Sequence, residues 1–98
     1  MKKFLFLYVG TGEARTDESM TRWRDWFASV GDAFVDSGNP LGAGRYLQNG
    51  SGASDLPSDG DSITGYSLVN ADSLQEAEKI AATCPAVSGI RVYEALPM

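Results

Sequence analysis

Residues 63–96, with the sequence ITGYSLVNADSLQEAEKIAATCPAVSGIRVYEAL, contain the pattern that decides the fold. Residues 63–70 are apolar enough to form a central strand, and residues 89–96 are predicted to form a second strand. A segment with helical spacing lies between them. The stretch therefore predicts a strand, a helix and a strand in succession, which is a βαβ unit.

The helix of this unit has a recognisable start and end. Asp72 is expected to cap its N-terminus, with Gln75 three positions later completing a capping box, and Pro85 stops it. One face of this helix carries small or apolar side chains, those of Leu74, Ala77, Ile80, Ala81 and Cys84. Since alanine takes little room, the helix is expected to lie close to the sheet.

The first half of the chain supplies the remaining elements. Residues 4–9 alternate aromatic and aliphatic side chains, and two apolar faces predict a central strand. Apolar spacings of three and four predict a helix from residue 17 or 18 to residue 36, with Gly31 inside it and Gly38 just beyond its end. Residues 43–48 are predicted to be a short strand.

This order of elements predicts an α+β fold in a single domain, residues 1–98. The order βαββαβ is ferredoxin-like, with a four-stranded antiparallel sheet and two helices on one face. The other face of the sheet keeps apolar side chains of the first and third strands, so it needs a cover. A second copy packed sheet to sheet would provide one, and we predict a homodimer through the open sheet face.

Composition excludes several classes of partner and compartment. Thirteen acidic and eight basic residues give a net charge of −5, which argues against binding to nucleic acid. A single cysteine, Cys84, rules out an intrachain disulfide and suits a reducing compartment. The apolar run at the N-terminus is too short for a signal peptide or a membrane span, so a cytoplasmic location is expected. Asp-Gly-Asp at residues 59–61 lacks the further ligands of a calcium loop, and no metal or cofactor is predicted.

Four segments resemble the YCII-related domain family. They are GYSLV at residues 65–69, ADSLQEA at 71–77, CP at 84–85 and IRVYE at 90–94. An aromatic first helix and the Gly-Asn-Pro-Leu turn at residues 38–41 fit the same pattern, so the resemblance covers nearly the whole chain. It implies a dimeric α/β barrel. In some relatives it also implies proton transfer or elimination on small ring compounds by a histidine with an acidic partner.

The chain departs from that chemistry. It contains no histidine, so the histidine role cannot be carried over. The Asp-Gly-Pro-Phe loop variant of the family is also absent, since Ser-Asp-Gly-Asp stands at residues 58–61. Glu94 is the remaining candidate for acid–base catalysis, because it shares one face of the last strand with Ile90, Val92 and Leu96 and would face the interior if they do. A solvent-exposed carboxylate at the end of a strand is the alternative, so whether the chain is an enzyme stays open.

Aromatic and basic side chains suggest a binding site instead. The rings expected around the space between the first helix and the sheet are those of Tyr8, Trp23, Trp26, Tyr66 and Tyr93. Arg45 and Arg91 could neutralise the carboxylate of a ligand. A small hydrophobic or aromatic metabolite is therefore the expected ligand. The alternatives are rings that only fill a core, a lyase or isomerase without histidine, and a structural or regulatory dimer with no ligand.

Overall fold

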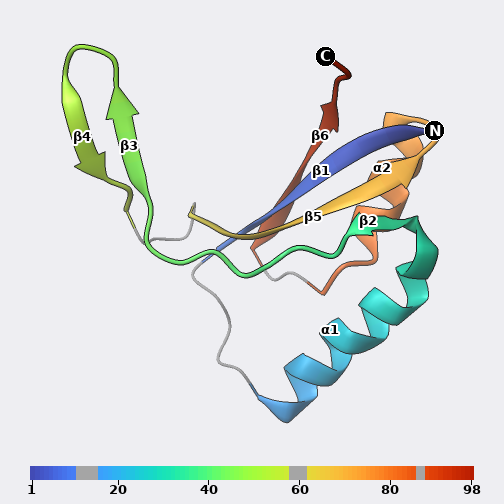
Figure 1. Ribbon diagram of the computed structural model, residues 1–98. Coiled ribbons are helices and arrows are strands. Elements are labelled where there is room, and N and C mark those ends of the chain that lie inside the picture. Colours follow the sequence, from blue (N-terminus) through green and yellow to red (C-terminus); the bar gives the residue numbers. More distant parts are fainter. Residues whose placement is uncertain (11–15, 58–61, 86–87) are drawn as a thin grey trace.

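The computed structural model describes residues 1–10, 16–57, 62–85 and 88–98 (Figure 1). It has two α-helices, a four-stranded antiparallel sheet and a separate two-stranded sheet. Along the chain the elements are β1 (Lys2–Val9), α1 (Asp17–Val30), β2 (Phe34–Asp36), β3 (Arg45–Gln48), β4 (Gly52–Asp55), β5 (Ile63–Ala71), α2 (Leu74–Ala82) and β6 (Gly89–Ala95). The larger sheet has the strand order β2-β5-β1-β6, and β3 pairs with β4. The α+β class is as predicted.

Strand β1 lies inside the sheet between β5 and β6, which confirms the prediction of a central strand. Its side chains alternate in burial. Phe4, Phe6 and Tyr8 are buried on one face, whereas Leu5 and Leu7 are half-buried on the other. The two apolar faces of this strand therefore meet different surroundings.

Both helices pack against the face that carries Phe4, Phe6 and Tyr8, which we call the helix-covered face. Trp26 of α1 belongs to the same buried cluster as Ala77 and Ala81 of α2. The indole Nε1 of Trp26 also donates a hydrogen bond of 2.9 Å to Thr83 Oγ1 just after α2. The two alanines lie in the core, and their small size lets α2 approach the sheet closely.

The first helix is shorter than predicted. Helix α1 ends at Val30, because Gly31 adopts a positive φ of 57°, and a short 3₁₀ helix, η1 (Gly31–Ala33), then leads into β2. The prediction of a helix to residue 36 was therefore wrong. Phe34 nevertheless packs its ring 5.1 Å from that of Phe27, so its sequence spacing imitates a continuing helix although it lies in a strand.

The second strand of the sheet was also assigned to the wrong segment. Phe34–Asp36 holds that position, paired with β5. Residues 43–48, predicted as the second strand, contribute Arg45–Gln48 to the separate hairpin. The earlier end of α1 allows the chain to enter the sheet sooner, which leaves this later segment free to form a hairpin of its own.

The cap of α2 differs by one residue from the prediction. Ser73 is the N-cap, and its hydroxyl accepts a hydrogen bond of 3.2 Å from the backbone N–H of Glu76. Serine and aspartate are both favoured at this position, so the neighbouring Asp72 satisfied the same sequence rule. The helix ends at Ala82, three residues before Pro85.

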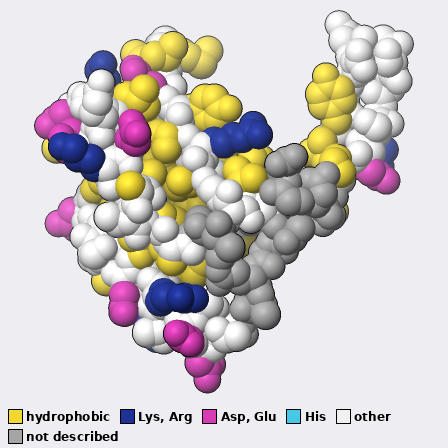
Figure 2. All heavy atoms as spheres, turned by 180° about the vertical axis from the view of Figure 1, so that it is seen from behind, with side chains coloured by type: hydrophobic (Ala, Val, Ile, Leu, Met, Phe, Trp, Pro, Cys, Tyr) yellow, Lys and Arg dark blue, Asp and Glu magenta, His cyan; other side chains and the backbone are white. Residues whose placement is uncertain are grey.

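Residues 45–55, consisting of β3, β4 and their turn, form a projecting hairpin that we call the arm. Figure 1 shows the arm extending beyond the end of the larger sheet, and Figure 2 shows it standing apart from the body with hydrophobic side chains along it. All four residues of each arm strand are exposed. At its base, Leu56 N donates a hydrogen bond of 3.0 Å to Gly44 O. The arm is therefore attached to the sheet only through its base, within the described part of the chain.

Candidate functional site

Three of the predicted ligand-binding rings form an aromatic cluster under α1. Tyr8 and Trp23 lie 5.2 Å apart between ring centroids, Trp23 and Trp26 lie 5.9 Å apart, and all three rings meet edge to face. Phe27 and Phe34 extend the cluster. These rings fill the space between α1 and the sheet, so the packing favours a core rather than an open pocket there.

The hydroxyl of Tyr8 is part of a buried chain of hydrogen bonds. Ser67 Oγ donates to the carbonyl oxygen of Ser37 at 2.6 Å, and Tyr8 Oη lies 2.7 Å from Ser67 Oγ. Because the serine hydrogen is used on the carbonyl, the tyrosine is the donor in the second bond. Burial raises the pKa of Tyr8 to about 12, so the phenol is protonated near neutral pH. It holds the core together and is unsuited to act as a base.

The remaining predicted residues of the sheet lie on its opposite side. Leu7 stands opposite Tyr66 in β5 and Arg91 in β6, while Leu5 stands opposite Leu68 and Tyr93. Residues directly opposite one another point to the same face, so these six side chains share one surface. We call the surface formed by Leu5, Leu7, Tyr66, Leu68, Arg91 and Tyr93 the open face. The five predicted aromatic residues therefore do not surround one space.

A polar cluster that the sequence analysis missed lies at the β2 edge of the open face. Tyr66 Oη lies 3.5 Å from Asp36 Oδ2, and Asn39 Nδ2 lies 3.3 Å from the same hydroxyl. Gly38 N donates a hydrogen bond of 2.8 Å to Asp36 Oδ1. We call Asp36, Asn39 and Tyr66 the Tyr66 cluster. The Gly-Asn-Pro turn was recognised in the sequence, but only the strand register shows that it meets Tyr66.

Gly38 makes the Tyr66 cluster possible. Its φ is +84°, and a Cβ built at this position would lie 1.6 Å from the backbone oxygen of Tyr66. Only a residue without a side chain permits so close an approach. The turn after β2 is thereby held against β5, and this positions the carboxylate and amide next to the tyrosine hydroxyl.

Glu94 and Arg45 do not join either cluster. Glu94 stands opposite Phe4, so it points to the helix-covered face, but it lies near the end of β6 and is exposed. Its carboxylate is 3.9 Å from the ammonium group of Lys2. Arg45 lies on the arm, 3.2 Å from Asp55. The surroundings of both residues are those of surface ion pairs.

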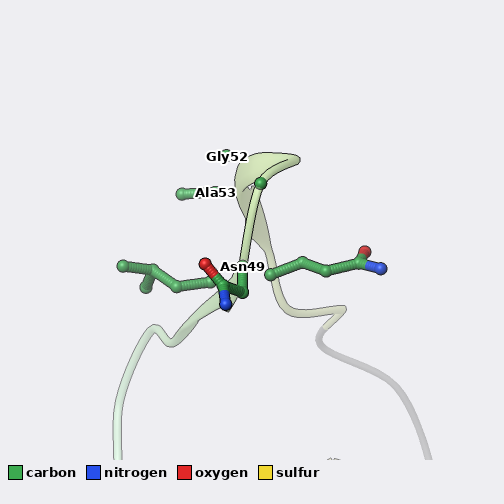
Figure 3. Close-up of a pocket in the computed structure, with 6 residues that line it drawn as sticks. Asn49, Gly52 and Ala53 are labelled. Atoms are coloured by element: carbon green, nitrogen blue, oxygen red, sulfur yellow. The ribbon is translucent and has the colours of Figure 1, made fainter.

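Two shallow hollows lie away from the open face. One is at the turn of the arm, where Asn49, Gly52 and Ala53 are among its lining residues, and Figure 3 shows that the side chains drawn there point in different directions. The other lies between α1 and α2 and has a volume of about 310 Å³. It is lined by Ser29, Val30, Ala33, Glu76, Lys79, Ile80 and Thr83. Neither hollow contains a residue of the predicted site.

Among the described residues, no group of three or more acidic or cysteine side chains could hold a metal ion. The helices in these same ranges lack the length and apolar character of a membrane-spanning segment. The Asp-Gly-Asp segment considered for calcium, and the Ser-Asp-Gly-Asp segment compared with the family loop, lie outside the described residues.

Comparisons with protein-family models, curated proteins and solved structures found no match for this chain. The resemblance to YCII-related domains therefore stays a prediction from the quoted segments.

Proposed function

We propose that this chain is a homodimeric, YCII-related binding domain that uses its open face to meet a second copy and to hold a small hydrophobic or aromatic molecule. The order β2-β5-β1-β6, with every neighbouring pair antiparallel, supports a ferredoxin-like arrangement. In that arrangement the arm is an insertion between two sheet strands. Two such sheets packed face to face would make the dimeric α/β barrel that the resemblance implies.

The observation that carries the proposal is the uncovered apolar centre of the open face. Leu5, Leu7 and Leu68 lie side by side there, on the side of the sheet away from the aromatic cluster. A continuous apolar surface of this kind marks an interaction site on a soluble protein. Packing against the same surface of a second copy would bury these three leucines in both chains.

The edges of the open face favour a ligand that combines an apolar body with an acidic group. Leu7 stands between Tyr66 on one side and Arg91 on the other. The backbones of these two polar residues are two strand spacings apart, roughly 10 Å, a span that suits a small aromatic acid. The arginine could pair with a carboxylate of the ligand, while the Tyr66 cluster offers hydroxyl, amide and carboxylate groups to the other end of the ligand. The ligand is thus placed on the open face and not among the packed rings under α1.

The dimer is tested by sedimentation of the wild type and two matched aspartate variants. We expect Leu68→Asp to be monomeric, because the charge would lie in the centre of the interface. Leu74→Asp is the control, since Leu74 is also apolar but exposed in the first turn of α2, where an acid is tolerated. It should remain dimeric. A wild-type protein that stays monomeric at high concentration would refute the proposal.

Ligand binding is tested by native mass spectrometry of the freshly purified dimer and by NMR titration with benzoate and phenylacetate. We expect Arg91→Ala to weaken binding of these acids by about tenfold, the usual effect of losing a charged hydrogen-bonding partner. Arg45→Ala is the matched control and should bind as the wild type does. The absence of both retained mass and titration shifts would remove the ligand and favour a structural or regulatory dimer.

An enzyme is the second candidate, and the pairing of Tyr66 with Asp36 favours it. A tyrosine hydroxyl beside a carboxylate can pass a proton to or from a bound ring compound without histidine. Any proton exchange that the dimer catalyses on an aromatic keto acid should disappear in Tyr66→Phe and persist in Glu94→Gln. The opposite result would return the role to Glu94.

A further inference from the structure

The hydrogen bonds of the Tyr66 cluster run in one direction. An amide nitrogen donates, so the bond of 3.3 Å from Asn39 Nδ2 uses a lone pair of Tyr66 Oη. An ionised carboxylate accepts, so the single hydrogen of the same hydroxyl is directed at Asp36 Oδ2, 3.5 Å away. The hydroxyl of Tyr66 therefore has no hydrogen left for a ligand, but it keeps one lone pair.

The carboxylate of Asp36 adds to this acceptor character. Asp36 stands opposite Leu68, on the open face, and its Oδ1 accepts a hydrogen bond of 2.8 Å from Gly38 N. None of the ion pairs within the described ranges includes Asp36, so its charge has no basic partner there. The amide of Asn39 offers a further donor and a further acceptor, which leaves the balance unchanged. The Tyr66 cluster thus presents lone pairs and a negative charge, which suit a hydrogen-bond donor.

Contacts on the other face of β5 hold these acceptors in place. Ser67 stands opposite Phe6 on the helix-covered face, and its buried hydroxyl donates to the carbonyl oxygen of Ser37 at 2.6 Å. Ser37 lies between Asp36 and Gly38 in the chain, so this bond fixes the segment that carries the carboxylate. Groups that are positioned before binding lose little freedom when a ligand arrives, so their polarity contributes fully to the choice of ligand.

The charges on the open face also set the orientation of an acidic ligand. Arg91 lies across Leu7 from Tyr66 and attracts a carboxylate, whereas Asp36 repels one. An aromatic acid would therefore turn its carboxylate toward Arg91 and the opposite end of its ring toward the Tyr66 cluster. That end has to supply a hydrogen for the lone pairs that it meets.

We propose that the ligand of the open face is an aromatic acid with a hydrogen-bond donor, a hydroxyl or amino group, on the ring opposite its carboxylate, and that Asp36 selects this donor. The inference rests on the proposed ligand site and narrows its ligand to one chemical class. Asp36 is then a specificity-determining residue. A ring that carries only an acceptor at that end, such as a methoxy group, would bring lone pairs together and gain no hydrogen bond from Tyr66 or Asp36.

Three probes that differ at one ring position test the proposal in the wild-type protein. They are phenylacetate, para-hydroxyphenylacetate and para-methoxyphenylacetate. We expect NMR titration to show that the hydroxyl group strengthens binding about tenfold over phenylacetate, the usual effect of a hydrogen bond to a charged group. The methoxy group should not strengthen binding.

A matched pair of variants tests the role of Asp36. Asp36→Asn keeps an acceptor for Gly38 N but replaces one carboxylate oxygen with a donor, so the ratio of affinities for the hydroxy and methoxy compounds should fall at least about fivefold. Asp25→Asn removes the same charge from an exposed position in α1 and should keep the wild-type ratio. An unchanged ratio in a folded Asp36→Asn protein would overturn the role of Asp36.

The outcomes separate the donor from the ligand site itself. Equal affinity for the hydroxy and methoxy compounds, together with measurable binding of phenylacetate, overturns the donor inference and leaves the proposed site standing. Titrations in which none of the three probes binds overturn both. If Asp36→Asn does not fold, the three wild-type titrations still decide the question, since they need no variant.

Discussion

The two apolar faces of strand β1 differ in what covers them. Phe4, Phe6 and Tyr8 lie under two helices, and the aromatic rings around them interlock edge to face. Leu5 and Leu7, their immediate neighbours in the chain, lie on a surface that neither helix covers. An apolar pattern in a strand therefore marks a surface that needs to be covered. It does not show whether another segment of the same chain or a second copy covers it.

Substitution of adjacent residues on the two faces should give the largest difference. Phe6→Ala removes a fully buried ring, so the free energy of unfolding should fall by roughly 3–5 kcal/mol at any protein concentration. Leu7→Ala should cost about 1 kcal/mol in dilute protein and more where the dimer forms, because its face is covered only by association. Urea unfolding at two protein concentrations measures both. Equal losses that do not vary with concentration would contradict the distinction between the faces.

Two glycines with the same backbone angle separate close approach from conformational strain. Gly38 and Gly50 both have a φ of +84°. A Cβ built at Gly38 would meet the backbone of Tyr66, whereas a Cβ built at Gly50 on the arm would have no atom within 4 Å. We expect Gly50→Ala to lower the free energy of unfolding by about 1–2 kcal/mol, from strain alone. Gly38→Ala should cost about 3 kcal/mol or somewhat more, because β5 must also shift. Similar losses in thermal melts would show that the turn does not press on the sheet.

The buried phenol of Tyr8 should make stability depend on alkaline pH. Its pKa is raised from an ordinary value of 10.0 to about 12 by burial, so the folded state holds the proton more tightly than the unfolded state. The contribution of this proton to the free energy of unfolding is complete below pH 10. It is lost as the pH rises toward 12, and the free energy of unfolding then falls by about 1.4 kcal/mol per pH unit. Tyr8→Phe should remove that part of the slope in urea unfolding. An unchanged slope would mean that the phenol is not buried in solution.

The smallest effect should be found on the arm. Arg45→Ala breaks an ion pair with Asp55 in which both side chains are largely exposed, so the free energy of unfolding should change by less than about 0.5 kcal/mol. Differential scanning calorimetry would show little change in melting temperature. A clear loss would indicate that the pair is covered, and thus that the arm has a partner under the conditions of the measurement.

The strands of the sheet centre and both helices could be predicted from local pattern, but the second strand could not. Phe34 continues the apolar spacing of α1, because its ring returns to the same cluster after the chain has turned at Gly31. The pattern records which side chains meet in the core and not the path of the backbone between them. Gly31, with its low helix propensity, was the one local sign that the helix ends there.

The candidate site was harder to predict because it depends on register. The aromatic residues Tyr8, Tyr66 and Tyr93 all lie on sheet strands, and their faces depend on how those strands are aligned. Tyr8 stands opposite Gly65, which places Tyr66 one position along and on the other side. A slip of one residue would have brought both tyrosines to the same face. Sequence alternation gives the relative faces within a strand and says nothing about the alignment between strands.

The strand order also has a consequence for how the protein is made. β1 pairs with β5 and β6, and both of these strands are translated after α1 and the arm. During synthesis the run FLFLYV therefore waits without either neighbour until most of the described chain has emerged from the ribosome, which is when an unpaired apolar strand is most exposed to aggregation. Lys2 and Lys3, placed directly before this run, carry the kind of charge that keeps such a nascent segment soluble.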